Sequence, residues 1–164
     1  MCRSNKVNWR DYVRYLEELE VKLAERNIHM RKCNDAEIAE VKENLGNKQL
    51  PKAYLEFLSI MGNGTGGKYL GGDSCFLDEL FDLEQGAVEL LEENESECNL
   101  SENDFVFWMT QGCMFCFFRL NEGNNPPVYL YNEDGEDRFI KISSTLTEFL
   151  INRLEMNIET FREK

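Results

Sequence analysis

The stretch DFVFWMTQGCMFCFFRL, Asp104–Leu120, is a long and mainly apolar run. Twelve of the sixteen positions from Phe105 to Leu120 are apolar, and Thr110-Gln111-Gly112 divides them into two arms rich in aromatic residues. Two apolar runs joined by a glycine-containing turn predict a β-hairpin. Neither arm alternates between apolar and polar residues, which indicates strands covered on both faces. We therefore expect this hairpin in the middle of a sheet.

The same stretch is too short to be a membrane span. A spanning helix needs roughly 18 or more uninterrupted apolar residues, whereas Thr110-Gln111-Gly112 breaks this run. The first six residues, Met1–Lys6, lead into an amphipathic pattern without the apolar core of a signal peptide. The sequence therefore predicts a protein that does not associate with membranes and stays in the cytoplasm.

Helical patterns surround the hairpin. Apolar residues at spacings of three and four predict helices over residues 8–26, from Asn34-Asp35 to Gly46, and from Leu50-Pro51 to Met61. Another helical pattern covers residues 83–94, after which residues 96–103 form a polar, acidic loop. A final helix, capped by Ser143 or Ser144, carries apolar residues as far as Leu154, and one more turn is expected over 157–164.

Two further strands are predicted after the hairpin, over residues 128–131 and 139–142, with the acidic turn 133–137 between them. The order of helices, then strands, then a helix indicates an α+β domain with helices concentrated near the N-terminus and one at the C-terminus. With 164 residues the chain fits one domain, and a domain of about this size buries roughly 68–70% of the surface that its unfolded chain exposes.

The loop Gly62–Tyr69, GNGTGGKY, comes within one residue of the phosphate-binding pattern GxxxxGK[ST]. That motif requires a strand before the loop and a helix after it, with a hydroxyl following the lysine. Here a predicted helix precedes the loop, Tyr69 follows Lys68, and Gly71-Gly72 would break a helix that started there. We therefore predict a tightly turned or flexible connection with positive φ angles, and no nucleotide site.

The cysteines and the histidine give only weak evidence for a redox, metal or catalytic site. Cys113 and Cys116 have the CxxC spacing of redox and zinc sites, but residues three apart on a strand point to opposite faces. No second CxxC or HxxxH pattern supplies the other two zinc ligands, and the single histidine, His29, has no recognisable catalytic partner. We predict reduced, mostly buried cysteines with a structural role, no metal, no cofactor and no catalytic residues.

Acidic residues are concentrated in one part of the chain. The fifty positions between Lys68 and Arg119 contain twelve acids and no basic residue, so that this block carries −12 of the formal net charge of −13. Such a charge repels nucleic acid, whose binding depends on Lys and Arg, and would attract a basic protein. The alternative is that an acidic surface simply keeps the protein soluble.

The order of several landmarks resembles the SUKH superfamily, which joins fungal cell-wall-synthesis regulators to bacterial immunity proteins of polymorphic toxin systems. The landmarks are LPKAYLEFL at 50–58, Gly62-Asn63-Gly64, the hairpin at 105–118, PPVYLY at 126–131 and LTEFL at 146–150. The family's hairpin usually carries His-Gln-Gly-Tyr where this chain has Thr110–Cys113. The resemblance covers 34–154 and implies one SUKH-like domain over 1–164, with 1–33 as an N-terminal helical extension.

The resemblance further implies a non-catalytic domain with a mixed, largely antiparallel sheet flanked by helices. It also implies a protein that binds and neutralises a cognate toxin domain, often a nuclease. Joined to the charge distribution, it leads us to expect that acids near the hairpin contact a basic toxin. A regulatory scaffold that binds a peptide or ligand, without a toxin partner, is the alternative. The partner-binding candidates are Glu92, Glu93, Glu95, Glu97, Glu102, Asp104, Glu133, Asp134, Glu136 and Asp137.

Overall fold

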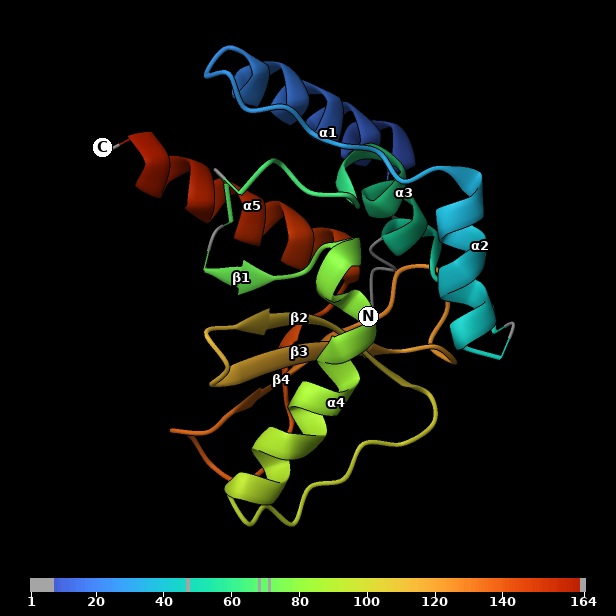
Figure 1. Cartoon of the computed structure of the whole chain (residues 1–164), viewed down its shortest axis with the longest axis vertical. Coiled ribbons are helices and arrows are strands. Elements are labelled where there is room, and N and C mark those ends of the chain that lie inside the picture. The colour runs from blue at the N-terminus through green and yellow to red at the C-terminus, as the bar shows by residue number, and fades with distance from the viewer. Residues whose placement is uncertain (1–7, 47, 68, 71, 163–164) are drawn as a thin grey trace, which may run out of the picture.

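A computed structural model describes residues 8–46, 48–67, 69–70 and 72–162, with side chains as far as Ile158. Within these ranges the chain forms five α-helices and one five-stranded sheet (Figure 1). None of the helices in the described part is long and apolar enough to cross a membrane. The elements are α1 (Trp9–Ala24), α2 (Asp35–Asn44), α3 (Lys52–Met61), β1 (Asp73–Ser74), α4 (Leu77–Glu93), β2 (Asp104–Thr110), β3 (Met114–Arg119), β4 (Val128–Asn132), β5 (Ile140–Ser143) and α5 (Leu146–Arg162).

The three N-terminal helices begin where the sequence predicts them. The Asn8 side chain accepts hydrogen bonds from the first backbone N–H groups of α1. Asn34 caps α2 through a reciprocal pair, in which the Glu37 N–H donates to Asn34 Oδ1 at 2.8 Å and the Asn34 N–H donates to Glu37 Oε1 at 2.9 Å. Pro51 directly precedes α3, a position where its missing N–H costs no helical hydrogen bond.

The sheet has the order β1-β2-β3-β4-β5, and each pairing in the described chain is antiparallel. The predicted hairpin is confirmed as β2 and β3, each of which has a neighbouring strand on both sides. The N–H of Cys113 donates to the Thr110 carbonyl at 3.1 Å across its turn. Gln111 and Gly112 have φ angles of 50° and 71°, as the favoured tight hairpin turns require.

A β-bulge explains why β2 does not alternate. Val106 pairs with Phe117 and Trp108 pairs with Cys116, so Phe107 is the extra residue. As a result, two consecutive aromatic side chains enter the same core: the ring centroids of Phe107 and Trp108 lie 5.4 and 5.7 Å from that of Phe149 in α5.

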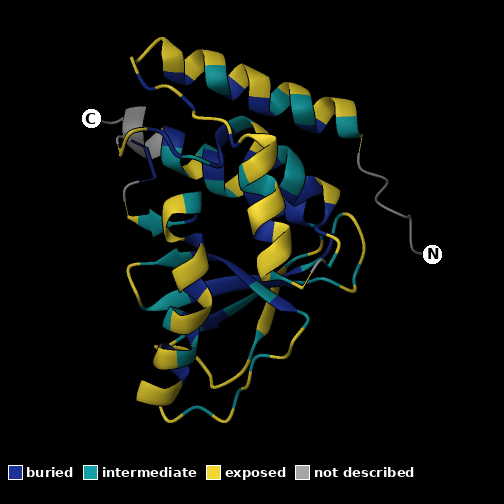
Figure 2. Ribbon diagram, turned by 45° about the vertical axis from the view of Figure 1, so that its right-hand side comes forward, coloured by how far each residue is buried: buried dark blue, intermediate teal, exposed yellow. Residues whose placement is uncertain are grey.

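Helices cover both faces of the sheet and produce three layers. One face packs on α3 and α5, since Tyr54 and Phe149 contact the aromatic rings of β2. The other face packs on α4, where Gly86 allows Met109 of β2 to approach closely. Beyond α3 and α5 lies α1, whose inward side is buried and whose outer side is exposed (Figure 2). The α+β prediction is confirmed.

The structure departs from the predicted boundaries in three places. Helix α4 begins at Leu77, six residues before the predicted start at Leu83, with Asp78 and Glu79 in its first turn, where acids favour the positive end of the helix dipole. Strand β1 was not predicted, because its two residues are polar and are held by pairing with Thr110 and Met109. Helix α5 continues to Arg162 as one helix, without a separate last turn.

Candidate functional site

The two acidic segments singled out from the sequence meet at one end of the molecule. The last turn of α4 and the residues that follow it lie beside the turn between β4 and β5, at the lower end of Figure 1. We call this region the acidic end, and all eight of its acids are exposed. They are Glu92, Glu93, Glu95, Glu97, Glu133, Asp134, Glu136 and Asp137.

Hydrogen bonds hold the two segments of the acidic end together. The Asn94 side chain donates to the Tyr131 hydroxyl at 2.8 Å and to the Glu133 carbonyl at 3.3 Å. The Asp137 carboxylate accepts a hydrogen bond from the Ser96 hydroxyl and another, of 2.9 Å, from the Glu97 N–H. The Asp137 carboxylate therefore holds the segment after α4 against the turn between β4 and β5.

These donors stabilise the charged form of Asp137. The hydroxyl of Ser96, followed by the backbone N–H of Glu97, lowers the pKa of the Asp137 carboxyl below its usual range. Because the pKa is lower in the folded state, this interaction is fully formed above the unfolded-state pKa of about 3.9. It is lost as the pH falls through the lower folded-state pKa. The contact between the two segments therefore persists at neutral pH and weakens only in acid.

Replacing Ser96 with alanine should raise the pKa of Asp137 toward its ordinary value, because the largest stabilising donor is removed. Titration of the Asp137 side-chain carboxyl carbon by NMR would measure the change. Ser101→Ala is the control, because it removes a serine hydroxyl from the same loop at a residue that contacts a different carboxylate. The backbone N–H of Ser101, which the substitution leaves in place, donates to Asp104. An unchanged Asp137 midpoint in Ser96→Ala would contradict the role assigned to this hydroxyl.

Two of the ten sequence candidates lie away from the acidic end. Glu102 is exposed and lies at the other end of the 95–103 loop, where its carbonyl accepts a hydrogen bond from Lys48 Nζ at 3.0 Å. Asp104 begins β2 and is only 9% exposed. Its Oδ2 accepts a hydrogen bond from the Ser101 N–H at 2.9 Å, and its Oδ1 lies 3.4 Å from Arg119 Nε. Asp104 therefore supports the loop instead of presenting a surface charge.

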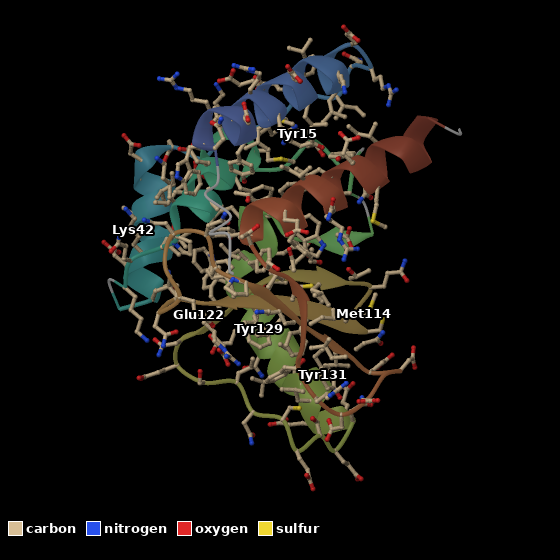
Figure 3. The ribbon with its side chains drawn as sticks, turned by 180° about the vertical axis from the view of Figure 1, so that it is seen from behind. Tyr15, Lys42, Met114, Glu122, Tyr129 and Tyr131 are labelled. Atoms are coloured by element: carbon tan, nitrogen blue, oxygen red, sulfur yellow. The ribbon has the colours of Figure 1, made fainter. Side chains whose placement is uncertain are left out.

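Arg119 links Asp104 to a small cluster at the end of β3. Its guanidinium carbon lies 4.3 Å from the centre of the Tyr129 ring, and its NH1 lies 3.7 Å from Glu122. The Tyr129 hydroxyl in turn donates to Glu122 at 3.1 Å, and the two side chains lie next to each other in Figure 3. The cluster pairs its charges internally, so we assign it a structural role.

The glycine-rich loop adopts the turned conformation predicted for it. Gly64, Gly66 and Gly67 have φ angles of 94°, 75° and 79°. The loop follows α3 and leads into the short strand β1, which is not the strand-loop-helix arrangement of a phosphate-binding loop. Asp78 and Glu79 line the hollow beside it. Lys68 lies outside the described residues.

The five described cysteines form no disulfide among themselves, and three of them, Cys33, Cys75 and Cys116, are buried. Burial raises the thiol pKa of Cys33 to about 11 and of Cys116 to about 12, so both thiols are protonated at neutral pH. Cys113 belongs to the hairpin turn and Cys116 to β3. Across the described residues, no group of three or more His, Cys, Asp or Glu could hold a metal ion. Cys2 lies outside those residues.

These observations define an α+β domain with an acidic surface at one end. The chain belongs to the SMI1 / KNR4 family (SUKH-1), whose family model matches residues 32–152. The match confirms the resemblance seen in the sequence. The family includes immunity proteins and is generally non-catalytic, with immunity or regulatory functions. A search of curated proteins finds no match.

One exposed apolar side chain of α4, that of Phe81, was not predicted from the sequence. Phe81 is 43% exposed on α4, and Glu84 lies one turn further along the same helix. Phe81 lies before the predicted start of this helix at Leu83, so the sequence pattern did not place it on a helical surface, whereas Glu84 falls within the predicted range 83–94. Extending the pattern of Leu83, Ala87 and Leu90 back to Leu80 would have shown Phe81 beside the buried stripe instead of within it.

Proposed function

We propose that this chain is a cytoplasmic immunity protein that binds and neutralises a basic toxin domain. Its membership of a family that includes immunity proteins supports the general class. The observation that carries the finer proposal is the acidic end, where eight exposed carboxylates from two segments are gathered on one surface. Arg138, which directly follows the turn between β4 and β5, has its Nε 2.7 Å from a carboxylate oxygen of Glu136.

A basic enzyme is the partner that this charge favours. A nuclease that binds phosphates presents Lys and Arg at its substrate surface. An acidic protein can occupy the same surface, and the long-range attraction between the two proteins speeds their encounter. Binding there would exclude the nucleic acid sterically and electrostatically. The immunity protein needs no catalytic group for this.

If the proposal holds, a toxin gene is expected next to the gene of this chain, and the test uses the protein that it encodes. A variant in which Glu92, Glu93, Glu95, Glu97, Glu133, Asp134 and Glu136 become Gln or Asn keeps Asp137, which holds the two segments together. We expect the association rate constant at low salt to fall at least about tenfold. Stopped-flow or surface binding would measure it, and growth of cells that express both proteins would measure neutralisation.

The control variant neutralises the same number of exposed acids elsewhere: Asp11, Glu17, Glu18, Glu25, Glu40, Glu43 and Glu148. If charge position matters, this variant should bind almost as fast as the unmodified chain. Equal binding by all three proteins, independent of salt, would contradict the electrostatic part of the proposal. Absence of any toxin binding or neutralisation by the unmodified chain would overturn the function itself.

A further inference from the structure

Two hollows lie along the same side of α4. The first, of about 340 Å³, lies between α2 and α4 over the start of β2. The second, of about 250 Å³, lies between α4 and the loop that follows it. Glu84 borders both hollows, and in Figure 1 the 95–103 loop runs alongside α4 toward α2. We call the two hollows together the α4 groove.

Apolar side chains form much of the α4 groove. Val41 and Leu80 line the first hollow and are buried, and Phe81 stands on its wall with 43% of its surface exposed. Val88 and Leu91 continue the apolar lining in the second hollow. Phe81 therefore does not stand alone: it continues the apolar lining of the two hollows, and contiguous apolar surface rimmed by polar residues commonly marks an interaction site.

The rim of the α4 groove is acidic. The exposed carboxylates of Glu84 and Glu102 border the first hollow, and those of Glu84, Glu92 and Glu95 border the second. No Lys or Arg is among the described residues that line either hollow. Two cations contact lining residues of the first hollow: Lys48 Nζ donates to the Glu102 carbonyl at 3.0 Å, and Arg119 Nε lies 3.4 Å from Asp104 Oδ1. The lining therefore complements an apolar group that is flanked by positive charges.

The length of the α4 groove matches a helical segment. Its lining on α4 extends from Leu80 to Glu92, and a rise of twelve helical residues spans roughly 18 Å. An amphipathic helix of about three turns covers that distance, with apolar anchors at i, i+3 or i+4, and i+7. The two hollows are then positions for successive anchors, and the rim acids face the basic flanks of such a helix.

We propose that the α4 groove binds a basic amphipathic helix of the partner protein, with apolar residues in the two hollows and Lys or Arg against Glu84, Glu92, Glu95 and Glu102. That the partner is a toxin rests on the proposed function. The groove itself is argued from its shape, apolar lining and charge. It adjoins the acidic end, since Glu92 and Glu95 belong to both surfaces.

The test uses a fluorescent peptide of about 15 residues, built from Leu and Lys with the helical spacing of three and four. We expect it to bind the full chain, and to bind Phe81→Ser and Glu84→Lys about tenfold more weakly, since loss of one central anchor commonly costs more than 1 kcal/mol. Fluorescence anisotropy measures the affinity. A scrambled peptide of the same composition has no apolar face and should bind much more weakly.

Two control variants distinguish a loss of the groove from a change in net charge or in exposed apolar surface elsewhere. Glu89→Lys makes the same charge change on the exposed side of α4, and Val21→Ser removes an apolar side chain that is 59% exposed on α1. Both should bind the peptide like the unmodified chain. Equal binding of the scrambled peptide, equal loss in Glu89→Lys, or no binding at all would overturn the proposal. A dimer lost in Phe81→Ser would assign the groove to a second copy and overturn it as well.

The same variants distinguish this proposal from the proposed function. If the unmodified chain neutralises the toxin and Phe81→Ser does so equally well, with equal affinity, the groove proposal fails while the immunity function stands. If the peptide binds in the groove but no toxin is bound or neutralised, the immunity function fails while the groove remains a site for basic amphipathic helices. Circular dichroism of each variant confirms that it is folded.

Discussion

Replacing Trp108 with alanine is expected to lower the free energy of unfolding by about 3–5 kcal/mol. Its side chain is 0% exposed in β2 and lies against Phe57 of α3 and Phe149 of α5, with ring-centroid distances of 6.4 and 5.7 Å. Removing the indole would leave a cavity where the sheet meets both helices. Urea unfolding followed by circular dichroism measures the change without depending on tryptophan fluorescence.

Two comparisons isolate the packing contribution of Trp108. Trp9 is only partly buried at the start of α1, so Trp9→Ala should cost clearly less than Trp108→Ala. Trp108→Phe keeps most of the apolar volume, and it also removes a buried Nε1–H that donates no hydrogen bond in the described structure. It should therefore cost under about 1.5 kcal/mol. Equal losses in Trp9→Ala and Trp108→Ala would contradict the central position of this ring.

Replacing Gly62 with alanine is expected to lower the free energy of unfolding by about 1–3 kcal/mol. The backbone itself would accept alanine, since φ is −61°. The added Cβ, however, would lie 2.5 Å from Cys33 Sγ and 2.7 Å from the Leu58 carbonyl oxygen. Both distances are far below van der Waals contact, so the end of α3 and the segment before α2 must move apart. Urea unfolding measures the loss.

Gly72 provides the control for this substitution. A Cβ at Gly72 would meet only Gln111 Nε2, at 3.7 Å, an ordinary contact. Gly72→Ala should therefore change the free energy of unfolding by no more than about 0.5 kcal/mol. A Gly62→Ala protein as stable as the unmodified chain would show that the close approach of α3 to Cys33 is not a constraint.

The central hairpin was predictable because its signal is local. Two apolar arms and a turn with Gly112 specify it within seventeen residues, and the structure confirms it. The bulge at Phe107 was not predictable, because it depends on how β2 pairs with β3 and on the space left by Phe149. Strand β1 is similar: its two polar residues become a strand only through their pairing with β2.

The acidic end was only partly visible in the sequence. The two acidic segments were identified, but their contact depends on hydrogen bonds from Ser96 and Glu97 to Asp137, forty residues along the chain. In the sequence, nothing distinguishes Asp104 from the exposed acids of the same acidic block. Only its position as the first residue of β2, next to Arg119, shows that it is buried. The α4 groove escaped prediction because it is formed by α2, α4 and a loop that are separate in sequence.

The packing of α1 has a consequence for how this domain is delimited. The family model covers 32–152, yet Leu16, Leu19 and Leu23 before that range, and Leu154 and Ile158 after it, are buried in the common core. The Tyr15 hydroxyl even bridges the two outlying parts by donating to Glu155 at 2.7 Å. The packed core therefore extends beyond the region that the family model matches on both sides. A fragment trimmed to residues 32–152 would lose part of its core, and with it the support of α1 for α3.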